Sequence, residues 1–342
     1  MPKKFLTVKN LEVVYTQNRK TVYAVNGISF RLSTGQTLGL VGETGAGKTT
    51  IAKSIMRILP DVSAKITNGE ILLDDEDVLQ KSEDEMRNIR GEKVAMIFQD
   101  PMTSLNPLIP VGDQILEVIQ LHSDCDKKEG TEKAEDMLEM VGIPRERYKE
   151  YPHQFSGGMK QRVVIAMALA CNPKLLLADE PTTALDVTIQ AQVLDLIREL
   201  REKYETSMIL ITHDLGVVAQ TCDSVAVIYA GQIVEYGVKE DIFDHPTHPY
   251  TIGLFGALPS MAIGENRLHS IKGLPPDPTA LPPGCKFWPR CPQMTEACKG
   301  EIPDREVSPH HFCRCILARD CEEAKTARAY RGGKDNECSY TT

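Results

Sequence analysis

The sequence predicts an α/β protein with a mostly parallel sheet, followed by a small region rich in cysteine and proline. Up to about residue 258, β-branched runs alternate with amphipathic helical patterns, which is typical of a parallel sheet covered on both faces. A glycine-rich turn at residues 42–49 joins a short apolar strand to a helix. Seven of the ten cysteines come after residue 284, and nine of the 21 prolines lie between Pro275 and Pro309.

The elements of the first region follow from these patterns in chain order. The expected strands cover residues 5–14, 22–31, 37–41, 94–98, 174–178 and 207–212, with two more near 225–229 and 233–236. The expected helices cover 49–59 and 187–203, two or three segments between 111 and 170, and a short stretch after residue 212. Beyond residue 275 the prolines remove backbone donors and exclude long helices or central strands.

Length, composition and charge limit the class of protein. At 342 residues, with 42% hydrophobic and 25% charged residues, a globular chain of roughly two domains is expected. The net charge of −9 argues against a dedicated nucleic-acid binder. The apolar runs of the chain are shorter than the about 18 residues that a membrane-spanning helix needs, and the N-terminus has no signal-peptide pattern. We therefore expect a soluble cytosolic protein that can still sit on a membrane protein.

Residues 42–49 read Gly-Glu-Thr-Gly-Ala-Gly-Lys-Thr and fit the phosphate-loop pattern G-x-x-x-x-G-K-[ST]. The glycines let several backbone N–H groups converge on one anion, and the positive end of the following helix adds to that field. Lys48 is expected to reach the β- and γ-phosphates and Thr49 to ligate Mg²⁺; the alternative is a chance glycine turn. The residues predicted to bind ATP and Mg²⁺ here are Gly42, Glu43, Thr44, Gly45, Ala46, Gly47, Lys48, Thr49 and Thr50.

An apolar strand ending in two carboxylates, Asp179 and Glu180, supplies the second signal. Such a strand delivers its last residues to the carboxyl edge of the sheet, where the phosphate loop also lies. Asp179 is expected to hold Mg²⁺ and Glu180 to orient or deprotonate the attacking water. A solvated strand end is the alternative.

A third signal is Ser156-Gly157-Gly158-Met159, just before an apolar helix. A helix start with Ser-Gly-Gly exposes N–H groups and a hydroxyl, so it forms an anion site of its own. Two such sites in one chain suggest that they meet across a dimer interface, although a purely structural N-cap would use the same residues.

These motifs, with Gln99, Ala184-Leu185-Asp186 and His213, occur in the order seen in ATP-binding-cassette (ABC) ATPases. The resemblance to this family covers about 250 residues of the chain. The resemblance implies a P-loop NTPase cassette with a RecA-like core, an antiparallel β subdomain and a helical subdomain at about 100–165. It implies head-to-tail dimers with each ATP between one phosphate loop and the other chain's Ser-Gly-Gly segment. Gln99 would contact Mg²⁺, Asp186 would lie across the interface and His213 would touch the γ-phosphate. An aromatic ring on the adenine is also expected, with Tyr15 preferred over Tyr23.

Three stretches look like the oligopeptide, dipeptide and nickel importers of that family: 99–107, 248–251 and 271–285. This resemblance implies an ATPase subunit at the cytoplasmic face of the membrane, driving uptake of dipeptides or oligopeptides. Its implied partners are a second ABC ATPase, two permeases and an extracellular or periplasmic solute-binding protein. A nickel or other small-solute importer, a soluble cassette acting on nucleic acid or translation, and an iron–sulfur redox protein with an ATP fold are the alternatives.

The cysteines after residue 284 are closely spaced and separated by stiff, proline-containing loops, a pattern that is typical of metal ligands. Their spacing lacks the paired C-x₂-C knuckles of structural zinc, so zinc is the weaker hypothesis. The resemblance to peptide-importer ATPases implies a [4Fe-4S] cluster, with Cys315 rather than Cys313 as fourth ligand. The implied ligands are Cys285, Cys291, Cys298 and Cys315.

We therefore expect four parts along the chain. They are a nucleotide-binding domain at 1–259, a proline-rich linker at 260–284, an iron–sulfur extension at 285–322 and a flexible tail at 323–342.

Overall fold

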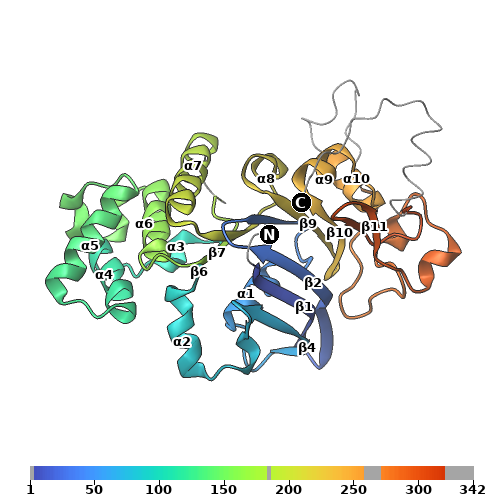
Figure 1. The fold of residues 1–342 in the computed structure, drawn as a ribbon, viewed down its shortest axis with the longest axis horizontal. Helices are drawn as coiled ribbons and strands as arrows, with labels where there is room; N and C mark the ends of the chain where they lie inside the picture. The colour runs from blue at the N-terminus through green and yellow to red at the C-terminus, as the bar shows by residue number, and fades with distance from the viewer. Residues whose placement is uncertain (1–3, 183–185, 258–270, 320–342) are drawn as a thin grey trace.

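The computed structural model of the chain describes residues 4–182, 186–257 and 271–319. Its strands form one sheet of eight and one of four. Figure 1 shows α7, α8, α9 and α10 on one side of the large sheet, with α1 and the small sheet on the other, and a block of helices at the far end. None of the helices in these ranges is long and apolar enough to cross a membrane.

The large sheet runs in the order β11-β12-β10-β9-β3-β8-β7-β6, and the five strands from β9 to the edge strand β6 are parallel. Because both faces are covered, these strands consist of continuous buried runs rather than alternating patterns. They are β3 (Thr37–Val41), β6 (Val94–Ile97), β7 (Leu175–Asp179), β8 (Ser207–Ile211) and β9 (Ser224–Tyr229). Their apolar runs made them predictable, and each lies within about two residues of its expected position.

The cysteine-rich region extends this sheet rather than standing apart from it. After the antiparallel β10 (Gln232–Val238) come β12 (His311–Cys313) and the edge strand β11 (Arg305–Ser308). Pro303 and Pro309 lie outside both strands, as they must because proline cannot donate to a ladder. The sequence did not predict β11 or β12, since four- and three-residue strands carry no resolvable period.

The small sheet is antiparallel and has the order β2-β1-β4-β5. It comprises β1 (Lys4–Gln17), β2 (Lys20–Ser33), β4 (Ala64–Leu73) and β5 (Glu76–Asp77). Only the first two strands were predicted. A glycine at position 69, with φ 110°, breaks the pattern of β4.

Helices α3–α6 form the block at the β6 end of the large sheet, where α3 and α6 pack together and α6 contacts β6. The ten α-helices of the described ranges are α1 (Lys48–Met56), α2 (Glu83–Glu92), α3 (Pro101–Ser104), α4 (Val111–His122), α5 (Lys127–Met140), α6 (Gly157–Leu169), α7 (Val187–Tyr204), α8 (Leu215–Thr221), α9 (Lys239–Asp244) and α10 (Pro249–Gly256). Sequence analysis missed α2, although Ser82 and Glu85 form a capping box at its start.

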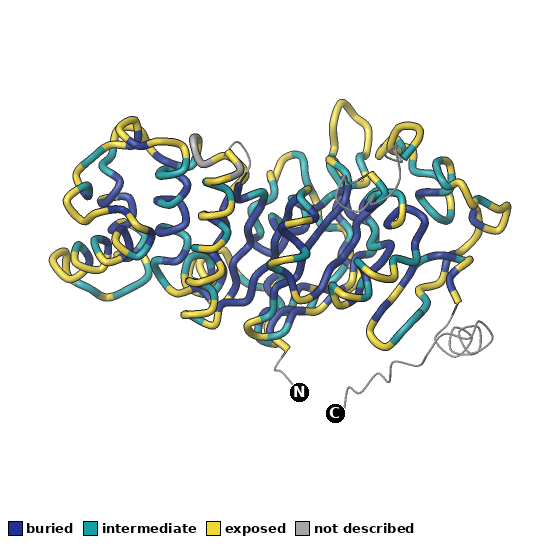
Figure 2. The backbone as a smooth tube through the Cα atoms, turned by 90° about the horizontal axis from the view of Figure 1, so that it is seen from above, coloured by how far each residue is buried: buried dark blue, intermediate teal, exposed yellow. Residues whose placement is uncertain are grey.

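Alternate residues of the central strands divide the core into two layers. In β7, Leu176 and Ala178 face the cluster shared with the helices, while Leu175 and Leu177 face the cluster shared with the small sheet. Figure 2 shows this buried layer running through the middle of the molecule, with exposed residues on the peripheral loops. The carboxyl ends of the parallel strands are thereby held in a rigid row.

A buried carboxylate ties the cysteine-rich region to the core. Glu235 of β10, 1% exposed, accepts from the N–H groups of Thr247 (2.7 Å) and His248 (3.0 Å). Its Oε1 also lies 2.8 Å from Nε2 of His311 on β12. A buried charge needs such partners, so Glu235 joins β10, β12 and the start of α10.

Aromatic packing makes the second junction. Phe287, 1% exposed, meets Tyr229 of β9 at 5.2 Å and Tyr250 of α10 at 5.4 Å between ring centroids, both edge-on. Such pairs add to the burial energy, and Phe287 therefore belongs to the main core cluster.

Phe287→Ala should lower the free energy of unfolding of the whole chain by about 3–5 kcal/mol, because it leaves a cavity in the shared core. Denaturant unfolding followed by circular dichroism measures this, with Leu274→Ala, at an 87% exposed position, as the neutral control. A separate early transition with an unchanged main midpoint would show instead that the extension is an independent unit.

Candidate functional site

The glycine-rich loop between β3 and α1 is pressed against its neighbours. Gly42 and Gly47 have φ of 151° and 103°. A Cβ at Gly42 would lie 2.1 Å from the carbonyl oxygen of Ile228, and one at Gly47 would lie 2.4 Å from that of Ala24. Only glycine fits at these two positions, so the loop follows the path that a phosphate cradle requires.

Lys48 is folded over this loop. Its Nζ donates to the carbonyl oxygens of Gly42 (2.8 Å) and Glu43 (3.0 Å), and the residue is 7% exposed. Burial lowers the pKa of Lys48, while the carboxylates of Glu180 and Asp179 act in the opposite direction. A cation held here, at the start of α1, faces the position where an anion would lie.

Two carboxylates end β7, as expected. Asp179 is 3% exposed, and its pKa is raised because it is buried. A hydrogen bond with the Thr49 side chain acts in the opposite direction and lowers the pKa. That contact joins two of the three residues predicted to contact Mg²⁺. Glu180 has φ 48° and donates its N–H to the carbonyl of Ile211 on β8 (2.8 Å). A non-glycine residue in this conformation costs energy, and such residues cluster at functional sites.

Side chains from three adjacent strand ends meet at Glu180. Gln99, after β6, donates its Nε2 to Oε2 of Glu180 at 3.0 Å. His213, after β8, places Nδ1 3.4 Å from Oε1 of the same carboxylate, with 71% of its side chain exposed. The arrangement holds a carboxylate and an imidazole together, open to solvent and next to the phosphate loop. Such a group can orient a water molecule.

Of the two candidate adenine-stacking tyrosines, Tyr15 lies beside the loop helix. Its hydroxyl is 3.3 Å from Oγ1 of Thr50. Tyr23 is 45% exposed, and its N–H donates to the carbonyl of Pro278 at 2.9 Å. Only Tyr15 therefore contacts the predicted nucleotide site.

The Ser-Gly-Gly segment lies elsewhere in the chain. Ser156 caps α6, its hydroxyl accepting from the N–H of Met159 at 3.4 Å, and Ser156 and Gly157 are exposed. Helix α6 packs at the β6 end of the sheet, with β7 and β8 between β6 and the loop strand β3. Asp186 likewise caps α7 by accepting from the N–H of Ile189 at 3.0 Å, while Ala184 and Leu185 lie outside the described residues. One chain does not bring these residues to its own phosphate loop.

The four predicted cysteine ligands line one small cavity, together with Trp288. Burial raises the pKa of Cys285, Cys291 and Cys315. Nε1 of Trp288 is buried and has no hydrogen-bond partner. Cys313, in β12, packs beside Cys315 but does not line this cavity, and its cross-strand neighbours are Glu235 and Arg305.

The described part of the chain contains no group of three or more His, Cys, Asp or Glu side chains arranged to hold a metal ion. The predicted [4Fe-4S] centre is thus not confirmed: the thiols share a cavity without forming a ready ligand set.

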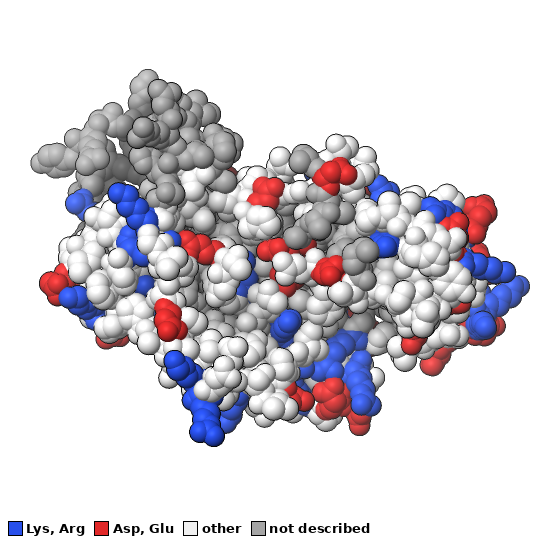
Figure 3. All heavy atoms as spheres, turned by 180° about the vertical axis from the view of Figure 1, so that it is seen from behind, with Lys and Arg blue, Asp and Glu red and all other residues white. Residues whose placement is uncertain are grey.

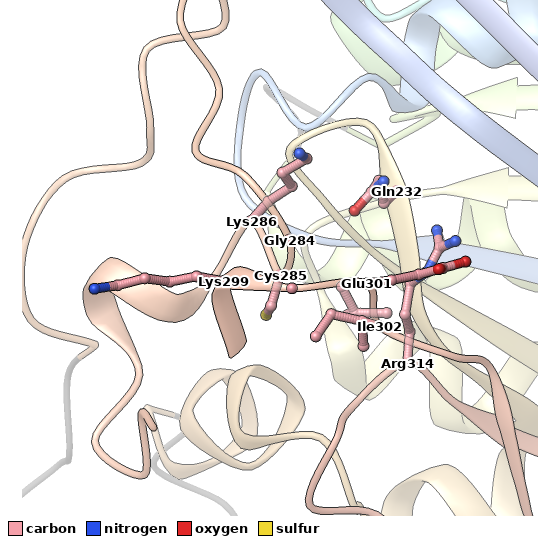
Figure 4. A pocket seen from close by; sticks show the side chains of 10 residues that line it. Gln232, Gly284, Cys285, Lys286, Lys299, Glu301, Ile302 and Arg314 are labelled. Carbon is pink, nitrogen blue, oxygen red and sulfur yellow. The ribbon is translucent and has the colours of Figure 1, made fainter. Parts of the chain in front are cut away.

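A larger cavity of about 410 Å³ lies between this region and β10. Figure 4 shows Lys286, Gln232 and Arg314 around it, with Glu301 and Lys299 along the segment that crosses it. It contains no residue of the phosphate loop.

One contact of the site was not predicted. Arg290 of the cysteine-rich region forms a double hydrogen bond with the carboxylate of Glu43 in the phosphate loop. Since 247 positions separate the two residues, no local spacing signals their contact.

Comparison with known proteins finds two matching families. The family described as ABC transporter matches residues 25–183, and the family described as oligopeptide/dipeptide transporter, C-terminal region, matches residues 234–298. The dipeptide transport ATP-binding protein DppD of Bacillus subtilis is 52% identical over 92% of this chain and 95% of its own length. The oligopeptide transport ATP-binding protein OppD of Escherichia coli is 49% identical over 91% and 92%.

Solved structures give the same fold. A dimeric post-hydrolysis state of the ATP-binding cassette MJ0796, bound to ADP and Pi, superposes with a TM-score of 0.62 at 26% identity, covering 68% of this chain and 98% of that one. A second structure of MJ0796, described as a dimeric bacterial ABC transporter cassette, gives 0.61 at 27% identity with the same coverage.

Proposed function

The chain belongs to the ABC transporter family and is an ATP-hydrolysing subunit of the peptide-importer type; from this premise we propose how its residues work and with what they work. The single observation that carries the proposal is the meeting of Lys48, Asp179, Glu180 and His213 at one sheet edge.

In the proposed reaction, the loop N–H groups and Lys48 bind the β- and γ-phosphates, and Tyr15 stacks on the adenine. Thr49, Asp179 and Gln99 hold Mg²⁺ directly or through water. Glu180, oriented by Gln99 and His213, takes a proton from the attacking water while the oxygen of that water bonds to the γ-phosphorus. The bond between the γ-phosphorus and the oxygen that bridges it to the β-phosphate breaks, which leaves ADP and phosphate.

The site is completed by a second cassette. Ser156 and Gly157 are exposed at the start of the 13-residue helix α6, a geometry that can bind a phosphate of the ATP held by the other cassette. Asp186 would lie across the same interface. The second cassette is a related but different ATPase, as the resemblance to peptide importers implies; a homodimer would use the same surfaces.

The proposed partners are two permeases at the cytoplasmic face of the membrane and a solute-binding protein on the other side. The segment after Gln99 would carry the signal between permease and ATP site. The relatives' names include dipeptide and oligopeptide transport, which supports peptides as the cargo. On the face shown in Figure 3, basic side chains lie among acidic ones, which is a poor surface for nucleic acid.

We also propose that Cys285, Cys291, Cys298 and Cys315 close around a [4Fe-4S] cluster. Their shared cavity and the buried, unpartnered Nε1 of Trp288 support this, because indole N–H groups can donate to cluster sulfur. When bound, the cluster would crosslink a segment that has little core of its own.

An affinity-tagged full-length chain, isolated from its own cells in mild detergent, should bring down two permeases with several membrane spans, a second cassette and a peptide-binding protein. Mass spectrometry identifies them. Recovery of ribosomes or DNA-repair factors in their place contradicts the proposal, and a nickel-binding protein would correct the cargo.

Glu180→Gln should keep ATP affinity within about twofold while lowering hydrolysis by about 100-fold or more, because it removes the proposed base without removing a phosphate contact. Nucleotide binding and phosphate release measure the two effects. Glu205→Gln, at the end of α7, is the control. Undiminished turnover would show that Glu180 is not the base.

The full-length protein purified without oxygen should hold about four iron and four sulfide ions per chain. Cys315→Ser should lose them and Cys313→Ser should retain them, because only Cys315 lines the shared cavity. Iron and sulfide analysis with visible absorbance reads both. A wild-type protein without iron, or the reverse pattern for the two variants, contradicts the assignment.

A further inference from the structure

Arg290 reaches from the cysteine-rich region into the phosphate loop. Its Nη1 and Nη2 donate to the two carboxylate oxygens of Glu43, at 2.8 and 3.1 Å. The Arg290 side chain is only 6% exposed and that of Glu43 26%. A bidentate, mostly buried pair of this kind is geometrically specific, and its charge-assisted hydrogen bonds are stronger than those between neutral groups.

Arg290 makes two further hydrogen bonds. Nη1 lies 3.2 Å from the hydroxyl of Tyr229 on β9, and Nε donates to the carbonyl of Lys272 at 3.1 Å. The guanidinium is therefore held on several sides, and its fork has one orientation, toward Glu43.

Both backbone polar groups of Glu43 are hydrogen-bonded within the chain. Its N–H donates to the hydroxyl of Tyr250 at 2.9 Å. Its carbonyl oxygen accepts from the Nζ of Lys48 at 3.0 Å and from the N–H of Ala46 at 3.1 Å. A force on the Glu43 side chain thus acts directly on the backbone that cradles phosphate and on Lys48.

The carboxylate of Glu43 also carries a negative charge within a loop that binds a polyanion. It interacts electrostatically with Lys48, so it is close to the phosphate position. Left unpaired, it would repel the triphosphate at short range in a partly buried site. Arg290 neutralises it.

The fold of the cysteine-rich region sets the position of Arg290. The residue ends the turn η4 (Trp288–Arg290), between Cys285 and Cys291. Its N–H donates to the carbonyl of Phe287 (2.9 Å), and the N–H of Cys291 donates to that of Trp288 (3.3 Å). Phe287 in turn packs on Tyr229 and Tyr250, the same tyrosines that contact Arg290 and Glu43.

We propose that Arg290 is a positioning residue of the nucleotide site, which orients the phosphate loop through Glu43 and cancels that carboxylate's repulsion of ATP. The cysteine-rich region is then a part of the ATP site. This rests on the proposed ATP-binding function.

The test measures affinity for a fluorescent ATP analogue, and KM and kcat for ATP, on the full-length protein. Arg290→Met should raise Kd and KM about tenfold, with kcat at saturating ATP within about twofold, because the effect falls on ground-state binding. Arg290→Lys should give Kd and KM values between those of the wild type and those of Arg290→Met. Arg314→Met is the control. It removes an arginine of the same region that pairs with Asp304, and it should leave Kd and KM for ATP unchanged.

Adding Glu43→Gln to Arg290→Met gives the sharper result. It removes the unpaired carboxylate, so ATP affinity should recover to within about threefold of wild type. Circular dichroism of each variant shows that it is folded before its ATP affinity is measured, and Arg290→Lys, which keeps the charge, carries the test if Arg290→Met does not fold. If the Glu43–Arg290 pair only stabilises the packing of the two regions, Arg290→Met would lower the thermal unfolding midpoint and leave the affinity for ATP unchanged.

Wild-type affinity in Arg290→Met, or a double variant as weak as the single one, overturns the proposal while the ATPase function stands. A wild-type chain that binds no ATP instead overturns the proposed function itself.

Discussion

Four neighbouring parallel strands, β3, β8, β7 and β6, end at one edge of the large sheet, and the chemistry of the protein depends on that alignment. Each strand delivers polar groups just past its last buried residue: the phosphate loop after β3, His213 after β8, Asp179 and Glu180 at the end of β7, and Gln99 after β6. The two-layer core on either side of these strands prevents them from sliding. Residues distant in sequence are therefore held within hydrogen-bonding distance of Glu180.

The same sheet explains why the cysteine-rich region is not an appendage. It adds β12 and β11 beyond β10, and the buried Glu235 joins it to the core through His311 and two backbone N–H groups. Phe287 completes the core between Tyr229 and Tyr250. A metal cluster would add a further crosslink, but the contacts that reach the phosphate loop come from side chains already in place.

Local patterns predicted the features that depend on local chemistry. The phosphate loop, the apolar strand β7 with its two carboxylates and the helix start at Ser156 lie where the sequence indicated, because short-range spacing determines each. Tyr15 was preferred over Tyr23, and only Tyr15 contacts the loop helix, at Thr50. The short strands β11 and β12 and the interrupted β4 have too little periodicity to be recognised. The Arg290–Glu43 pair depends on tertiary packing alone. The cysteine pattern predicted a metal site, whereas the described chain places the four thiols around one cavity without a ready ligand set.

The central claim is that ATP phosphates bind where these strands end, on a loop that the cysteine-rich region supports. Hydrogen–deuterium exchange of the full-length chain, with and without Mg²⁺ and ATP, tests it most directly. The account predicts slower exchange in peptides covering residues 42–50, together with those covering 285–291. Unchanged exchange across 42–50 at saturating ATP would contradict it.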